Sequence, residues 1–153
     1  MQELRFTGWA GGARAVAPDV FAKRDAQVAR QLDLLLDYLT PDSVFLDLGS
    51  PDCELALRAA GFAERVWCVE AGHGMSLGVR APCNLRLARL EAIAANSVDV
   101  AFAGTGVHIA EVFRVLKPRG VFISRTGRAQ IKAAGFRVSP FAFLPGRPVV
   151  ARK

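Results

Sequence analysis

The sequence predicts an α/β protein: a three-layer sandwich with a mixed, mostly parallel sheet of about seven strands and helices on both faces. Short apolar runs typical of strands alternate along the chain with helical patterns, the order that produces a parallel sheet. Several of these runs are almost wholly apolar, as expected of strands covered on both faces. The last two runs flank Pro145, Gly146 and Arg147, so the sheet should end in an antiparallel hairpin.

Length and composition predict one globular domain. The chain has 153 residues, of which 52% are hydrophobic and 22% charged. These values suit a single core and exclude a disordered chain. Residues 1–18 are rich in glycine and alanine and are predicted to be a flexible lead-in to a domain over 19–153.

The first elements follow from apolar spacing and from proline. Over 20–39 the apolar residues recur along one helical face, and Pro41 disfavours helix at the residue before it. Val44–Leu48 is apolar except at Asp47, which is typical of a buried strand. A second helix is expected from Pro51 to a glycine cap at Gly61.

The later elements follow the same logic. The remaining strands are expected at 66–70, 84–90, 98–104, 121–125, 136–144 and 148–152. The third of the seven strands alternates apolar and polar residues and is predicted to lie at an edge. A helix over 108–117 should stop at Pro118-Arg119-Gly120, and a short helix should end at Gly135.

Charge and hydropathy narrow the possible partners. The formal charge is +6, from 20 basic and 14 acidic residues, but the arginines are scattered and no dense basic run occurs. A solvated, arginine-rich surface is therefore favoured over a nucleic-acid face. No apolar run is long enough to span a membrane, and the first residues lack the apolar core of a secretory signal.

The cysteines predict free thiols. Cys53, Cys68 and Cys83 are odd in number and form no C-x-x-C pair. This favours free thiols over a disulfide framework or a structural zinc site. Free thiols in turn suggest a reducing compartment such as the cytoplasm. Cys68 falls within an expected strand and should lie in the core.

Three stretches resemble the class I S-adenosylmethionine-dependent methyltransferases. VFLDLGSPDC matches the family's strand, acid and glycine turn, and VWCVEAG matches the next strand, which ends in an acid. The most specific stretch is SVDVAFAGTGVHIAEVFRVLKPRGVFIS. Its matching residues are Ser97, Asp99, Glu111, Arg114, Val115, Leu116, Lys117, Pro118 and Gly120.

The resemblance implies a Rossmann-like sheet and S-adenosylmethionine as cofactor, bound beyond the carboxyl ends of the strands. The acid matching Asp47 would contact the amino-acid part of the cofactor, and the acid matching Glu70 would accept hydrogen bonds from both ribose hydroxyls. The predicted cofactor-binding residues are Asp47, Gly49, Ser50, Glu70, Ala71, Arg89, Leu90 and Gly104.

Three residues depart from the family pattern. Pro51 and Cys53 stand where the family has glycines, and a proline cannot adopt positive φ. Arg89 stands near the position of an acid that contacts the adenine amino group, although Glu91 is close. These departures keep a second hypothesis open: a catalytically inactive member of the fold that acts as a binding or dimerisation module.

Methyl transfer asks little of the protein beyond an in-line approach and, for some acceptors, a base. His73 and His108 follow the second and fourth strands and are weak candidates for that base; local hydrogen bonding is the simpler interpretation. Irregular ligand spacing argues against a metal site. The expected partner is a small-molecule acceptor or another protein chain, including a second copy that covers apolar surface near the third strand.

Overall fold

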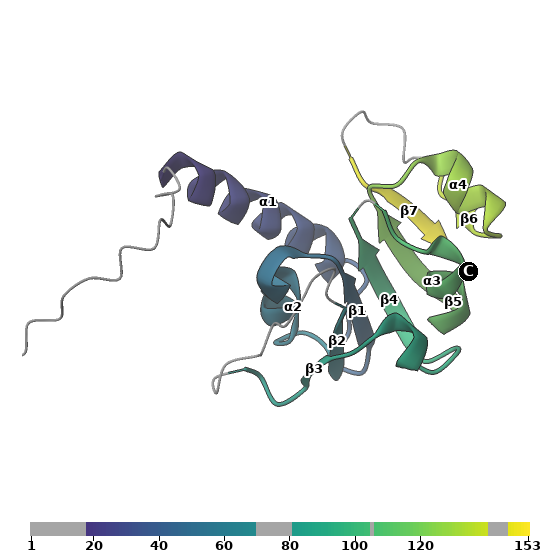
Figure 1. Ribbon diagram of the computed structural model, residues 1–153, viewed down its shortest axis with the longest axis horizontal. Helices are drawn as coiled ribbons and strands as arrows, with labels where there is room; N and C mark the ends of the chain where they lie inside the picture. The colour runs from purple at the N-terminus through teal and green to yellow at the C-terminus, as the bar shows by residue number, and fades with distance from the viewer. Residues whose placement is uncertain (1–17, 70–80, 105, 141–146) are drawn as a thin grey trace, which may run out of the picture.

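The computed structural model describes residues 18–69, 81–104, 106–140 and 147–153, and it contains the predicted mixed sheet (Figure 1). The seven strands lie in the order β3-β2-β1-β4-β5-β7-β6. The first five in sequence pair in parallel, whereas β7 is antiparallel to both β5 and β6. Their bounds are β1 Val44–Leu48, β2 Arg65–Val69, β3 Leu85–Leu87, β4 Val98–Ala103, β5 Leu116–Ser124, β6 Arg137–Val138 and β7 Val149–Arg152.

Helices cover both faces of the sheet, which confirms the three-layer prediction. On one face, α1 (Pro18–Leu36) and α2 (Glu54–Ala59) enclose a core cluster that contains Phe45. On the other, α3 (Ile109–Val115) and α4 (Arg128–Ala133) enclose a second cluster that contains Leu46. Two 3-10 turns complete the described elements: η1 at Pro51–Cys53 and η2 at Leu90–Ala92.

Several predicted boundaries were wrong by a few residues. The first helix ends at Leu36 and not at residue 39, and the third strand covers only three residues, although it lies at the sheet edge as predicted. The second helix is capped by Ala60 in a helical conformation, so Gly61 is not the left-handed cap that the sequence suggested. Of the predicted lead-in, residues 1–17 lie outside the described residues, and Pro18 is already helical.

The largest boundary error concerns the start of β5. The helix predicted to reach Lys117 ends at Val115, and the strand begins at once with Leu116, which pairs with Val98. Lys117 Nζ then binds both carboxylate oxygens of Asp99 on β4, at 2.9 and 2.8 Å. Pairing with β4 therefore overrides the helical pattern of the sequence, and the register shifts between Val98 and Val100.

Gly120 is required for this tight pairing, which gives a first testable prediction. A Cβ atom at residue 120 would lie 2.8 Å from the carbonyl oxygen of Lys117 and 3.3 Å from that of Asp99. We expect Gly120→Ala to lower the free energy of unfolding in urea by about 2 kcal/mol, because such crowding forces backbone shifts.

Gly61 offers a matched control, because a Cβ atom there meets nothing within 4 Å and its φ is not positive. Gly61→Ala should leave the unfolding midpoint unchanged or raise it slightly. Equal midpoints for the two alanine variants would contradict the crowding argument.

None of the helices in the described parts of the chain is both long and apolar enough to cross a membrane.

Candidate functional site

The candidate site lies where the chain changes direction across the sheet. From β1 the chain adds β2 and then β3 on one side, and it crosses to β4 and β5 on the other. Ligands of open parallel sheets bind beyond the carboxyl ends of the strands at such a switch point. Gly49 follows β1 there and Gly104 follows β4, and the amide of Gly104 donates a hydrogen bond to the carbonyl of Leu48 (3.3 Å).

Among the described residues, no side chain or backbone crowds the glycine turns at the carboxyl ends of β1 and β4. Gly49 has φ +80° and Gly106 has φ +78°, a region that favours glycine, and Gly104 has an ordinary φ. Chain neighbours aside, a Cβ atom built at any of the three would meet no atom of the described residues within 4 Å. Two predicted cofactor residues, Gly49 and Gly104, are thus brought together where backbone is accessible to a ligand.

The loop after Gly49 has an unusual backbone. Asp52 (φ 55°) and Cys53 (φ 50°) are consecutive non-glycine residues in the left-handed region. This conformation costs about 1–2 kcal/mol per residue, less for aspartate. Cys53 thus has a positive φ although it stands where the family has a glycine. The loop is anchored by the amide of Gly49, which donates to the carbonyl of Val69 (3.1 Å), and by Arg24, which contacts the Asp52 carboxylate at 2.7 Å.

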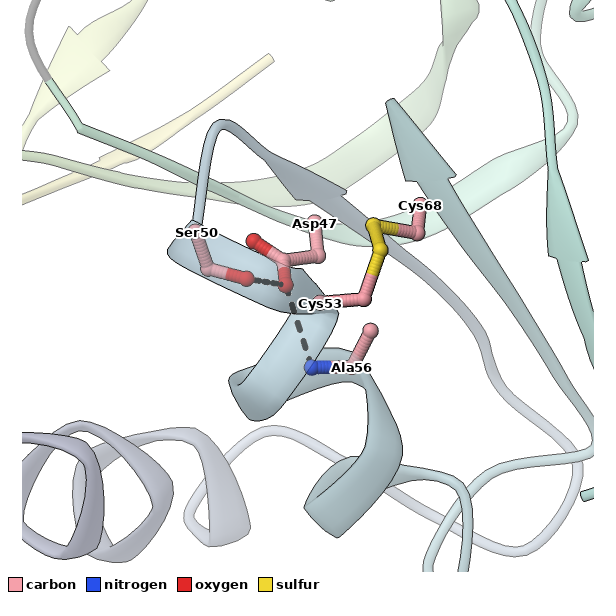
Figure 2. The surroundings of a disulfide bond; sticks show 5 residues. All are labelled: Asp47, Ser50, Cys53, Ala56 and Cys68. Carbon is pink, nitrogen blue, oxygen red and sulfur yellow. Dashed lines mark hydrogen bonds between the residues drawn. A yellow bond between two sulfur atoms is a disulfide. The ribbon is translucent and has the colours of Figure 1, made fainter. Parts of the chain in front are cut away.

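The prediction of three free cysteines was wrong, because Cys53 and Cys68 form a disulfide (Figure 2). Parallel pairing places Cys68 opposite Asp47, and η1 folds back until the two cysteine Cα atoms are 6.2 Å apart, within the range for disulfides. Both residues are fully buried, whereas Cys83 is exposed and free. The inference of a reducing compartment, which depended on free thiols, loses its premise. The sequence did contain a signal for this disulfide that was missed. Cys53 follows one predicted strand, and Cys68 lies within the next strand along the chain.

Asp47 binds the loop and the start of α2 through hydrogen bonds (Figure 2). It is fully buried, and its Oδ2 accepts hydrogen bonds from the Ser50 hydroxyl and from the Ala56 amide (3.0 Å). Among the described residues, nothing donates to Oδ1. Burial raises the pKa of Asp47 to about 6, against the lowering effect of the Ser50 hydroxyl, the Ala56 amide and the Ser50 amide. The Asp47 carboxyl therefore links Ser50 in the loop and the first turn of α2 to β1.

Arg89 and Leu90, two predicted cofactor-binding residues that follow β3, differ in exposure. Arg89 is exposed and precedes η2, whereas Leu90 is buried in the core cluster under α3. Arg114, one of the residues that resemble the methyltransferase pattern, holds this segment: its guanidinium donates to the carbonyls of Leu90 (3.1 Å) and Ile93 (2.9 Å). Arg114 therefore fixes the segment that contains two of the predicted cofactor-binding residues.

The other predicted residues divide into two groups. Glu70, Ala71 and His73 lie outside the described residues. His108 is exposed at the start of α3, where its side chain makes no capping hydrogen bond. In the described parts of the chain, no three His, Cys, Asp or Glu side chains are grouped to hold a metal ion.

Comparison with known proteins identifies the fold. No protein-family model and no curated protein matches the chain by sequence. Among solved structures, an S-adenosylmethionine-dependent methyltransferase from Mesorhizobium loti is 16% identical with a TM-score of 0.63, over 85% of this chain and 100% of that one. The 1,6-didemethyltoxoflavin-N1-methyltransferase of Burkholderia thailandensis, solved with S-adenosylhomocysteine, is 16% identical with a TM-score of 0.62, over 93% and 92%.

The [4+2]-cyclase SpnF is also similar, at 18% identity and a TM-score of 0.58 over 71% of this chain. The present chain spans only 57% of that cyclase. Sequence identities this low establish shared architecture and not shared chemistry. With the strand order and the glycine turns at the switch point, the comparisons show that this chain has the fold of the class I S-adenosylmethionine-dependent methyltransferases.

Proposed function

We propose that the chain binds S-adenosylmethionine where β1 and β4 end and transfers its methyl group to a small-molecule acceptor. One observation carries this proposal: two glycine turns, Gly49 and Gly104, lie side by side at the switch point, and no described residue beyond their chain neighbours crowds either one. Backbone without side chains lets a ligand approach closely. The M. loti and B. thailandensis structures, both named as methyltransferases, support the choice of ligand.

The described residues fit the amino-acid part of such a ligand. Asp47 Oδ1 is a buried acceptor that no described residue satisfies, and buried acceptors normally have a partner. An ammonium group is a suitable donor for it, directly or through water. The ribose contact expected of Glu70 and the contacts of Ala71 stay predictions, because both residues lie outside the described parts of the chain.

Bound S-adenosylmethionine would supply an electrophilic methyl group on a sulfonium. The protein's own part is mainly orientation, because in-line approach accounts for much of the rate gain in such transfers. The glycine turns and the loop tied to Asp47 would fix the cofactor. His108 is exposed after β4 and remains a candidate to accept a proton from the acceptor.

The test is binding of S-adenosylhomocysteine, measured by isothermal titration and by thermal shift. At a hundredfold excess over its dissociation constant, the ligand should stabilise the chain by about 2.7 kcal/mol. We expect Gly104→Leu to weaken binding at least about tenfold, because its side chain enters the open space without backbone strain.

Gly61→Leu is the matched control, since Gly61 is equally open but follows α2 and not a strand at this edge. It should bind like the unmodified chain. No stabilisation of the unmodified chain at millimolar ligand would sink the proposal and favour the inactive binding module. Binding without release of S-adenosylhomocysteine from S-adenosylmethionine, across a panel of small acceptors, would refute methyl transfer alone.

A further inference from the structure

The loop that carries the candidate site is closed by a covalent bond. The loop begins at Gly49, after the carboxyl end of β1. It ends at Cys53, whose disulfide joins it to Cys68 near the end of β2 (Figure 2). Between them, Asp52 and then Cys53 itself hold left-handed backbone angles. Strained residues of this kind persist only where surrounding bonds over-determine them.

We propose that the Cys53–Cys68 disulfide is a redox-controlled clamp: it holds the 49–53 loop in the shape that binds the adenosyl cofactor, and its reduction weakens that binding. This inference rests on the proposed function, since the affinity it controls is that of the proposed cofactor.

The contacts show how the clamp reaches the site. Cys68 lies opposite Asp47 in the ladder between β1 and β2. Asp47 binds the Ser50 hydroxyl on one side of Cys53 and the Ala56 amide on the other. The disulfide therefore pins the centre of the same segment whose flanks the carboxylate holds. Without the disulfide, no covalent bond holds the left-handed backbone of Cys53 in place. The adjoining turn at Gly49 is then less firmly fixed.

The chemistry of release is dithiol–disulfide exchange. A thiolate of an external dithiol attacks one sulfur, the Cys53–Cys68 bond breaks, and a mixed disulfide forms. The second thiol of the reductant then displaces the protein sulfur. Two electrons and two protons pass to the protein, which is left with two thiols, while the dithiol becomes a disulfide.

Burial of the disulfide couples this exchange to ligand binding. Both cysteines are fully buried, so a reductant reaches them only when the loop opens. A ligand that holds the loop closed lowers the population of the open form and therefore slows reduction. At equilibrium the coupling is reciprocal: if reduction lowers the affinity for the ligand, the ligand also shifts the thiol–disulfide equilibrium toward the disulfide.

The experiment compares the full chain before and after treatment with dithiothreitol. Thiol titration in denaturant should count one free thiol before treatment, from Cys83, and three after it. We expect titration with S-adenosylhomocysteine to show an affinity about tenfold or more lower for the reduced chain. We also expect saturating S-adenosylhomocysteine to slow the appearance of the two new thiols.

Two variants separate the clamp from general loss of stability. Cys53→Ala/Cys68→Ala should bind as weakly as the reduced chain and should not respond to dithiothreitol. Gly120→Ala, which destabilises the fold far from the loop, should keep the affinity of the oxidised chain when assayed below its unfolding transition.

The outcomes distinguish the two proposals. Equal affinity of the oxidised and reduced chains would overturn the clamp and leave the proposed function intact. So would a loss of affinity in oxidised Gly120→Ala as large as the loss caused by reduction. Absence of binding in both redox states would overturn the proposed function and the clamp with it. If the reduced chain unfolds, its affinity cannot be compared, and the test becomes the rate at which dithiothreitol produces new thiols in the oxidised chain. A rate that S-adenosylhomocysteine does not slow would overturn the clamp.

Discussion

Reduction of the Cys53–Cys68 disulfide should lower the free energy of unfolding by about 3 kcal/mol. The two cysteines are 15 residues apart, and opening a loop of that length restores about this much chain entropy to the unfolded state. Single domains are commonly stable by only about 5–15 kcal/mol, so this one bond is a large share of the total. The disulfide also confines the left-handed Cys53, whose conformational cost would otherwise oppose folding of the loop.

The measurement is urea unfolding with and without dithiothreitol. For a chain of this length, a loss of about 3 kcal/mol corresponds to a fall in Tm on the order of 10 °C. Cys83→Ser is the control, because Cys83 is exposed and outside the disulfide. This variant should match the unmodified chain in both conditions. An unchanged midpoint in a sample that titrates with three free thiols would contradict the prediction.

The fold could be predicted because the central strands are apolar on both faces. Phe45 and Leu46 are consecutive and fully buried, yet they belong to core clusters on opposite sides of the sheet. A continuous apolar run is therefore the expected signature of β1, and its alternation with helical segments implies parallel pairing. The start of β5 could not be predicted, because Leu116 and Lys117 fit a helical pattern until β4 is present to pair with them.

The candidate site could be located from sequence, but its internal structure could not. Gly49 and Gly104 were predicted from the ends of strands, and the structure brings them together. The positions of Cys53 after one strand and of Cys68 within the next were a signal for the disulfide, but the bond also depends on the register of β1 against β2 and on the fold of η1. The side-chain direction of Asp47 could have been predicted, because side chains alternate between the two faces along a strand. Asp47 therefore shares the face of Phe45, which lies against α1 and α2.

That direction makes Asp47 the source of a pH-dependent stability. Burial raises its pKa from the ordinary value of 3.8 to about 6 in the folded chain. Between these values the folded chain keeps a proton that the unfolded chain has released. Stability contributed by the protonated carboxyl is thus fully present below about pH 4 and is lost as pH rises through 6. The difference of about two pKa units corresponds to about 3 kcal/mol.

Comparison with Asp47→Asn isolates this contribution. The asparagine amide does not titrate, and the pH dependence from all other groups is the same in both chains and cancels in the difference. We expect the unmodified chain to lose about 2–3 kcal/mol of unfolding free energy relative to Asp47→Asn between pH 4 and pH 7. Ser50→Ala provides a directional control: the Ser50 hydroxyl donates to the carboxylate and lowers its pKa, so removing it should shift the transition to higher pH. A stability difference that stays constant across this pH range would mean that the folded chain holds Asp47 ionised throughout. The loop would then be anchored by a buried charge, and Asp47 Oδ1 would need a donor beyond the described residues.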